Sequence, residues 1–219
     1  MIRPTRLTVL LAGVASVVTA AAMLVGFGVI TGPRLDFLVI KDGFFTGPDR
    51  FAVLAGVGAI CLGQLAPLRL RVGTGAVQMA WGEAAIIVAC VWLPAALVPV
   101  SVLVGITIAH VARSIFITRR PANAVVFNIA QLTVAGCLAT TAVTAIDPSY
   151  DLHLNARTVV ALCMGAATWF ATSGYLVAVR LVAGGQSEKV GATFRALVGS
   201  RVIMLVGNMA LGLLIVWAQ

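Results

Sequence analysis

The sequence predicts an all-α fold, a polytopic bundle in which about seven helices cross a membrane. The chain has 219 residues, of which 61% are hydrophobic and only 10% charged. Soluble domains average roughly 45–50% apolar and about 25% charged residues. The apolar residues form long runs, and most Lys and Arg lie in the short segments between them. So much apolar surface would aggregate in water, so lipid is the expected solvent.

Seven apolar runs approach or exceed the roughly 20 residues that a helix needs to cross the hydrocarbon core. They cover residues 7–30, 51–68, 75–93, 95–117, 123–146, 158–182 and 197–217. The first run follows Arg3 and Arg6, but it is too long for a signal peptide and no clear A-x-A cleavage pattern closes it, so we expect a retained helix. Pro94 makes the turn between the third and fourth runs tight. No linker divides the chain, so we predict a single integral membrane domain over residues 1–219.

The basic residues predict the orientation of the bundle. One side holds most of them: Arg3, Arg6, Arg69, Arg71, Arg113, Arg119, Arg120, Arg180, Lys189, Arg195 and Arg201. On the other side, four basic residues are diluted by five aspartates. The positive-inside rule places the first side in the cytoplasm. We therefore expect a cytoplasmic amino terminus, an extracytoplasmic Gln219, and a net charge of +8 that sets topology and binds no nucleic acid.

Glu83 is the only acidic residue well inside a predicted span, and Gln78 precedes it by five positions. A carboxylate in lipid needs a cation, hydrogen-bond donors or a proton. His110 and Arg113 are expected at a similar depth on the next run, so they are candidate partners. Two interpretations stay open: a structural polar clamp between two helices, which we favour because no second ionisable group is predicted in mid-membrane, and a ligand or proton site.

Asn128 and Gln131 are three residues apart, so they share one face of a helix. Amides among small residues suit close packing and hydrogen bonds between helices, and a pocket lined by these amides is the sharper alternative. Small residues at four-residue spacing, such as Ala161 and Gly165, suit helix association within the chain or between two chains. A homodimer is therefore one expected assembly.

The motifs of several enzyme classes are absent from the sequence. It contains no P-loop, no GxSxG and no HExxH. The four cysteines are isolated in apolar runs and form no CxxC pair: Cys61, Cys90, Cys137 and Cys163. His110 and His153 fall on opposite sides of the predicted bundle, and no acidic cluster is present to hold divalent cations. We therefore predict no catalysis by this chain, no metal site and no cofactor.

Residues 81–146 carry a recognisable order of short motifs. It runs Trp81-Gly82-Glu83, Leu93-Pro94, Arg119-Arg120-Pro121 and Phe127-Asn128-Ile129-Ala130-Gln131. This order resembles the amino-terminal membrane regions of bacterial cyclic-di-GMP signalling proteins, which are similar to MASE sensor domains. In that family the region precedes a cytoplasmic diguanylate cyclase or an EAL or HD-GYP phosphodiesterase. The resemblance covers the middle third of the chain; the rest agrees only in helix count.

The resemblance implies a membrane-embedded sensory and dimerisation module of the bacterial inner membrane, non-catalytic by itself. Membrane lipids and a cytoplasmic output domain or partner protein are the implied partners. Because the predicted topology leaves Gln219 outside, the chain would be part of a longer signalling protein or a stand-alone relative. The alternative from another class is a substrate-binding membrane subunit of a small-molecule transporter, for which a polar-lined interior of six or seven helices is equally suitable.

Overall fold

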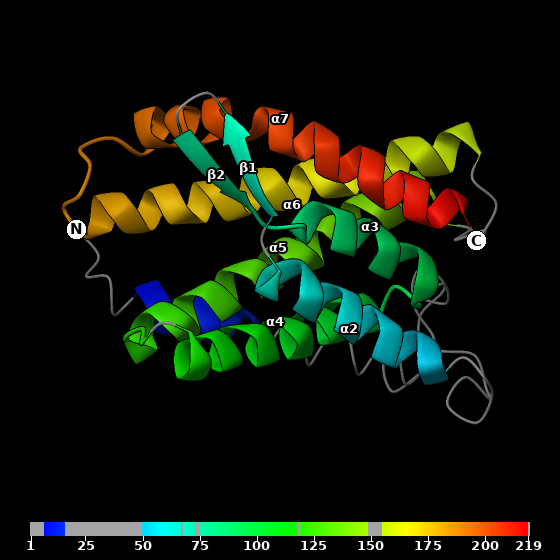
Figure 1. Cartoon of the computed structure of the whole chain (residues 1–219), viewed down its shortest axis with the longest axis horizontal. Helices are drawn as coiled ribbons and strands as arrows, with labels where there is room; N and C mark the ends of the chain where they lie inside the picture. The colour runs from blue at the N-terminus through cyan, green and yellow to red at the C-terminus, as the bar shows by residue number, and fades with distance from the viewer. Residues whose placement is uncertain are drawn as a thin grey trace.

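The computed structural model describes residues 7–15, 50–66, 68–72, 75–117, 119–148 and 155–218. The described elements are a helix over residues 7–15 and eight further helices and strands (Figure 1). In order the eight are α2 (Arg50–Leu65), β1 (Leu68–Val72), β2 (Gly75–Met79), α3 (Gly82–Trp92), α4 (Leu97–Phe116), α5 (Ala122–Ile146), α6 (Ala156–Ala183) and α7 (Val190–Trp217). Over the described residues the fold is thus all-α apart from one hairpin of two short strands.

Three of these helices, α4, α5 and α6, are long and apolar enough to cross a membrane. A fourth span is added if the two parts of α7, which are bent by 54° at Gly199–Arg201, are counted as one. Gly199 and Ser200 lie at this bend, and Gly/Ser pairs are a recognised cause of sharp helix kinks. The apolar helices α2 and α3 are shorter. The 11 residues of α3 rise only about 16 Å, roughly half of a hydrocarbon core.

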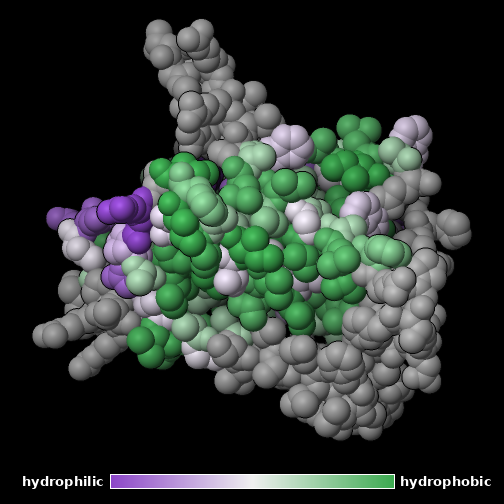
Figure 2. All heavy atoms as spheres, turned by 60° about the horizontal axis from the view of Figure 1, so that its bottom comes forward, coloured by the Kyte–Doolittle hydropathy of each residue, from purple (hydrophilic) through white to green (hydrophobic). Residues whose placement is uncertain are grey.

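Large apolar side chains cover the outside of the bundle. Ile203 is 86% exposed and Phe116 is 82% exposed. Figure 2 shows a broad hydrophobic surface over the helices, with hydrophilic residues gathered at one end. A soluble protein rarely exposes an apolar surface of this extent, so the surface fits the lipid environment that the sequence predicts.

The prediction of one continuous helix over residues 75–93 was wrong. Its first part is β2, which pairs antiparallel with β1 from Leu68↔Met79 to Val72↔Gly75. The second run likewise ends its helix at Leu65, short of the predicted residue 68. The sequence over residues 68–72, LRLRV, alternates apolar and basic residues, and this period of two is typical of a strand. By contrast, α4, α5 and α6 begin and end within two residues of the predicted bounds.

The helices α2 to α7 form a closed ring through their packing. Around the ring, α7 packs on α3, α3 on α2, α2 on α4, α4 on α5, α5 on α6 and α6 on α7. The expected tight pairing of α3 with α4 is therefore not the main one, because α3 packs mostly against α7 and α2. Residues 7–15 lie outside the ring, where Leu7 and Leu11 pack with Phe127 and Ala130 of α5. Arg180 of α6 lies 4.3 Å from the centre of the Phe127 ring and adds a cation–π contact.

Glycine and alanine allow the helices of the ring to approach closely. A Cβ at Gly105 of α4 would lie 2.8 Å from the carbonyl oxygen of Val57 on α2. A Cβ at Gly212 of α7 would lie 3.1 Å from the Cα of Ala84 on α3. Gly165 faces α5 in the same way, and the neighbouring Ala161 is fully buried. These small residues thus make contacts within the chain, as expected for apolar bundles that lack a hydrophobic drive in lipid.

Candidate functional site

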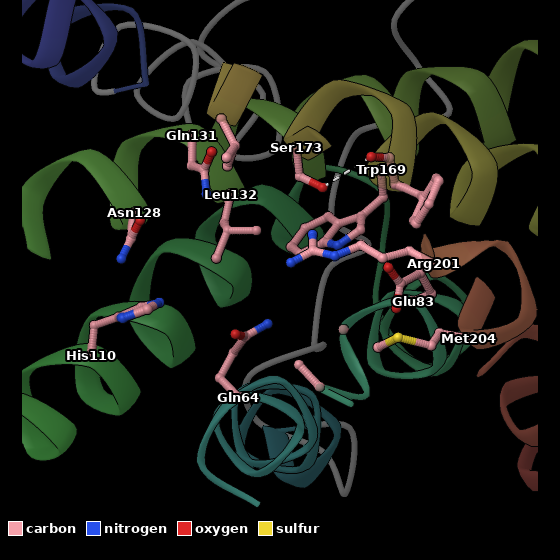
Figure 3. A pocket seen from close by; sticks show the side chains of 14 residues that line it. Gln64, Glu83, His110, Asn128, Gln131, Leu132, Trp169, Ser173, Arg201 and Met204 are labelled. Atoms are coloured by element: carbon pink, nitrogen blue, oxygen red, sulfur yellow. Dashed lines mark hydrogen bonds between the residues drawn. The ribbon is translucent and has the colours of Figure 1, made fainter. Parts of the chain in front are cut away.

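A cavity of about 300 Å³ lies inside the ring, and all six helices of the ring contribute to it (Figure 3). Its polar lining comes from Gln64 of α2, Glu83 of α3, His110 of α4, Asn128 and Gln131 of α5, Ser173 of α6 and Arg201 of α7. Trp169, Phe170, Leu132, Val177 and Met204 add apolar walls. These residues belong to the later halves of α4 and α6 and the earlier halves of α5 and α7. The cavity therefore lies nearer the end of the bundle that holds the α4–α5 and α6–α7 connections.

Four of the six residues that the sequence predicts for a site line this cavity: Glu83, His110, Asn128 and Gln131. They come from three different helices, and the fold brings them together. The volume falls at the lower end of the roughly 300–1,000 Å³ that is usual for small-molecule sites. The arrangement is therefore large enough for a small organic molecule.

The other two predicted site residues are not part of the described lining. Gln78 lies on β2, where its backbone pairs with that of Arg69, and its side chain lies outside what the structure describes. Arg113 follows His110 by one turn of α4 and does not line the cavity. Its Nε is buried and has no hydrogen-bond partner within the described ranges. Neither Gln78 nor Arg113 therefore supports the candidate site.

His110 and Gln131 are the unusual members of the lining. They are only 8% and 6% exposed, yet both ring nitrogens of His110 and the Oε1 of Gln131 have no hydrogen-bond partner among the described residues. In Figure 3 both side chains point into the space between the helices. An unpaired buried polar group costs about 1–3 kcal/mol. Native proteins rarely accept that cost unless a ligand or an ordered water uses the group.

Glu83 has a protein partner on α7. The Nδ2 of Asn208, which is 3% exposed, donates to Glu83 Oε2 at 2.6 Å and to the Ala80 carbonyl oxygen at 2.9 Å. Glu83 also lies in the first turn of α3, where the helix dipole favours a negative charge. The predicted polar clamp is therefore present, but it joins α3 to α7. His110 is not the partner of Glu83, because its ring nitrogens are both unpaired.

Trp169 forms a fixed wall of the cavity. A Cβ at Gly82 of α3 would lie 3.2 Å from its Nε1, and a Cβ at Gly136 of α5 would lie 3.2 Å from its Cζ3. The indole is thus held between two glycines on opposite helices and is only 3% exposed. A residue larger than glycine at position 82 or 136 would displace the indole ring. The two glycines thus leave room for the ring and hold it in place.

Sequence reasoning missed Gln64, Trp169, Ser173, Arg201 and Met204 as lining residues. Arg201 was counted only among the basic residues around the connection before the last helix, although the predicted seventh run of residues 197–217 already contains it. The structure begins α7 at Val190, which places Arg201 well inside a helix. The available signal was an arginine between two apolar stretches, which in a membrane helix marks a functional position.

The described residues contain no group of three or more His, Cys, Asp or Glu side chains that could hold a metal ion. The four cysteines are free thiols. The cavity instead offers amides, an imidazole, a hydroxyl, a carboxylate and a guanidinium, which suit hydrogen bonding to an organic molecule. The chain matches no protein-family model, no curated protein and no solved structure.

Proposed function

We propose that this chain is a membrane-embedded module that binds a small polar molecule inside its helix ring and acts as the input part of a signalling system. The observation that carries the proposal is the pair of unpartnered, buried polar side chains, His110 and Gln131, in a cavity of about 300 Å³. A ligand repays the cost of keeping these groups unpaired.

The ring explains how binding would act on the rest of the bundle. Because every helix from α2 to α7 contributes to the lining, a bound molecule contacts them all and favours the arrangement that closes around it. A signal requires that the ligand bind two arrangements with different affinity. The motif order of residues 81–146 supports the signalling context. In that context the module dimerises, and a change in its helix arrangement is transmitted to a cytoplasmic output domain or partner protein.

A substrate-binding subunit of a transporter is the second candidate, because the same polar cavity among membrane helices suits it. The two candidates differ in whether the molecule crosses the membrane. Vesicles that contain the purified protein should bind the molecule without accumulating it if the chain is an input module. Accumulation that depends on an energising partner would favour the transporter.

Site-directed stability measurements test the cavity. His110→Leu and Gln131→Leu each remove an unpaired buried polar group, so the ligand-free variants should be as stable as the native protein or more stable by about 1 kcal/mol. Both should lose the stabilisation that a ligand gives, which is about 2.7 kcal/mol at 100 times its Kd. Thermal unfolding in detergent against a metabolite panel measures both effects.

Ser101→Ala is the matched control for these variants. Ser101 lies on α4 with His110, and its buried Oγ also has no partner in the described segments, but it does not line the cavity. Its removal should leave ligand stabilisation unchanged. A panel in which no compound stabilises the native protein, or in which His110→Leu responds like the native protein, would contradict the proposed site.

We further propose that the basic end of the bundle faces the cytoplasm. On this topology the α6–α7 connection is cytoplasmic, and the start of α6 is extracytoplasmic. In a variant without native cysteines, Gln186→Cys should react with an impermeant maleimide only in inside-out vesicles. Ala156→Cys should react only in right-side-out vesicles, since both positions are exposed. Reaction of both positions from the same side would refute this topology.

A further inference from the structure

Arg201 gives the cavity a positive charge. It lies at the bend of α7, and Figure 3 shows its side chain extending from α7 towards the middle of the cavity. Arg201 is exposed, so it lies at the open side of the cavity that it lines. A charged group among membrane helices is normally matched by an anion or by water. The guanidinium of Arg201 also offers a planar fork of donors that fits a carboxylate with two parallel hydrogen bonds.

The carboxylate of Glu83 does not occupy this fork. The charge of Arg201 acts on Glu83 electrostatically, but Oε2 of Glu83 accepts the hydrogen bond of Asn208. The first turn of α3 adds the helix dipole to that support. Glu83 thus has its own donor, and no residue in the described ranges pairs with Arg201, which is left to bind an acidic group that enters the cavity.

The walls around Arg201 favour a flat molecule. The indole of Trp169 is held between Gly82 and Gly136, is only 3% exposed and forms a rigid aromatic wall of the cavity. Aromatic pairs adopt edge-to-face as well as offset-stacked arrangements, so a planar ring can pack against this wall. A volume of about 300 Å³ has room for a one-ring molecule, with little left for a long chain.

The opposite side of the cavity offers hydrogen bonds that no described residue uses. His110 in its neutral form presents one donor and one acceptor, and Gln131 presents the free acceptor Oε1. Asn128, one turn before Gln131 on α5, adds a donor and an acceptor. This mixed edge fits a ring that itself carries adjacent donors and acceptors, as heterocycles with amide-like groups do.

We infer that the cavity binds a small planar heterocycle that carries one acidic group. The acidic group pairs with Arg201, the ring packs against Trp169, and its polar edge bonds to His110 and Gln131. This inference rests on the proposed function, because it names the class of molecule that the same site takes.

Matched probes separate the three recognition elements. Orotate and uracil share one ring but only orotate has a carboxylate, while benzoate has a carboxylate on a ring without a hydrogen-bonding edge. Binding to purified protein in nanodiscs should be strongest for orotate, with uracil and benzoate weaker by about tenfold or more, which is the loss of roughly one charge-assisted interaction. Arg201→Gln should remove the preference for orotate over uracil. Arg195→Gln on the same helix, which is exposed and does not line the cavity, should keep it.

The outcomes distinguish this inference from the proposed function. If neutral or aliphatic members of a wider metabolite panel bind and the acidic heterocycles do not, the inferred class is wrong while the binding function stands. Equal affinity of the native protein and Arg201→Gln for orotate also overturns the class. If no member of the panel binds the native protein, both the class and the binding function fail. Stronger binding of orotate than of benzoate and uracil, with the preference over uracil lost in Arg201→Gln, supports both.

Discussion

Gly105→Leu should destabilise the protein by about 3 kcal/mol or more, the largest effect of any substitution considered. A Cβ at this position would lie 2.8 Å from the Val57 carbonyl oxygen and 3.0 Å from Ile60 Cγ2. The first of these atoms belongs to the backbone of α2, so it cannot move aside as a flexible side chain could. The two helices would have to separate, and overpacking of this kind costs roughly 1–3 kcal/mol even where side chains can adjust.

Gly207→Leu is the control for this change, since Gly207 is exposed on α7 and a Cβ there meets nothing within 4 Å. It adds the same side chain in a helix of similar composition and should shift stability by less than about 0.5 kcal/mol. Unfolding of both variants by denaturant in mixed micelles measures the difference. Equal stability of the two variants would show that α2 and α4 do not approach as closely as described.

Asn208→Leu should cost about 2–3 kcal/mol of folding stability. Its side chain makes two hydrogen bonds to the α3 region, one of them to the carboxylate of Glu83 at 2.6 Å. Leucine has a similar size but leaves that carboxylate and the Ala80 carbonyl group without their donor. Removing one member of a buried pair costs the desolvation of the other, which is larger for a charged group than for a neutral one.

A double-mutant cycle tests whether the loss of stability in Asn208→Leu comes from its bond to Glu83. Glu83→Gln keeps an acceptor for Asn208 and should change stability by less than about 1 kcal/mol. Asn208→Leu should then be less harmful when combined with Glu83→Gln than in the native background, because a neutral group is left unpaired. Additive effects of the two substitutions would mean that the bond between α3 and α7 does not hold the ring together.

The sequence was sufficient for the parts of the fold that length and hydrophobicity decide. The long apolar runs predicted α4, α5 and α6 well, because a continuous helix is the simplest way to satisfy the backbone in lipid. Residues 75–79 adjoin the apolar helix α3, and hydropathy alone could not separate a strand from a helix there. Residues 75–79 form a strand because they pair with residues 68–72. The hydropathy of one segment gives no information about its pairing with another segment.

The candidate site, too, could be predicted from the sequence only in part. Glu83, His110, Asn128 and Gln131 were visible because polar residues stand out in apolar runs. Their convergence was not, since it depends on the order of helices around the ring. The partner of Glu83 was missed for the same reason, since Asn208 lies 125 positions away along the chain. The predicted contribution of residues 16–30 and of Gln219 lies outside the described residues.

Equilibrium dialysis tests the central claim, a ligand site inside the helix ring, most directly. Native protein in nanodiscs is dialysed against an extract of polar metabolites, and the retained compounds are identified and counted by mass spectrometry. If the site exists, one compound should be retained, and its amount should approach one molecule per chain at saturation. The amount retained should be at least about tenfold lower in the double variant His110→Leu with Gln131→Leu. Equal retention by the native protein and the double variant, or no retention by either, would contradict this claim.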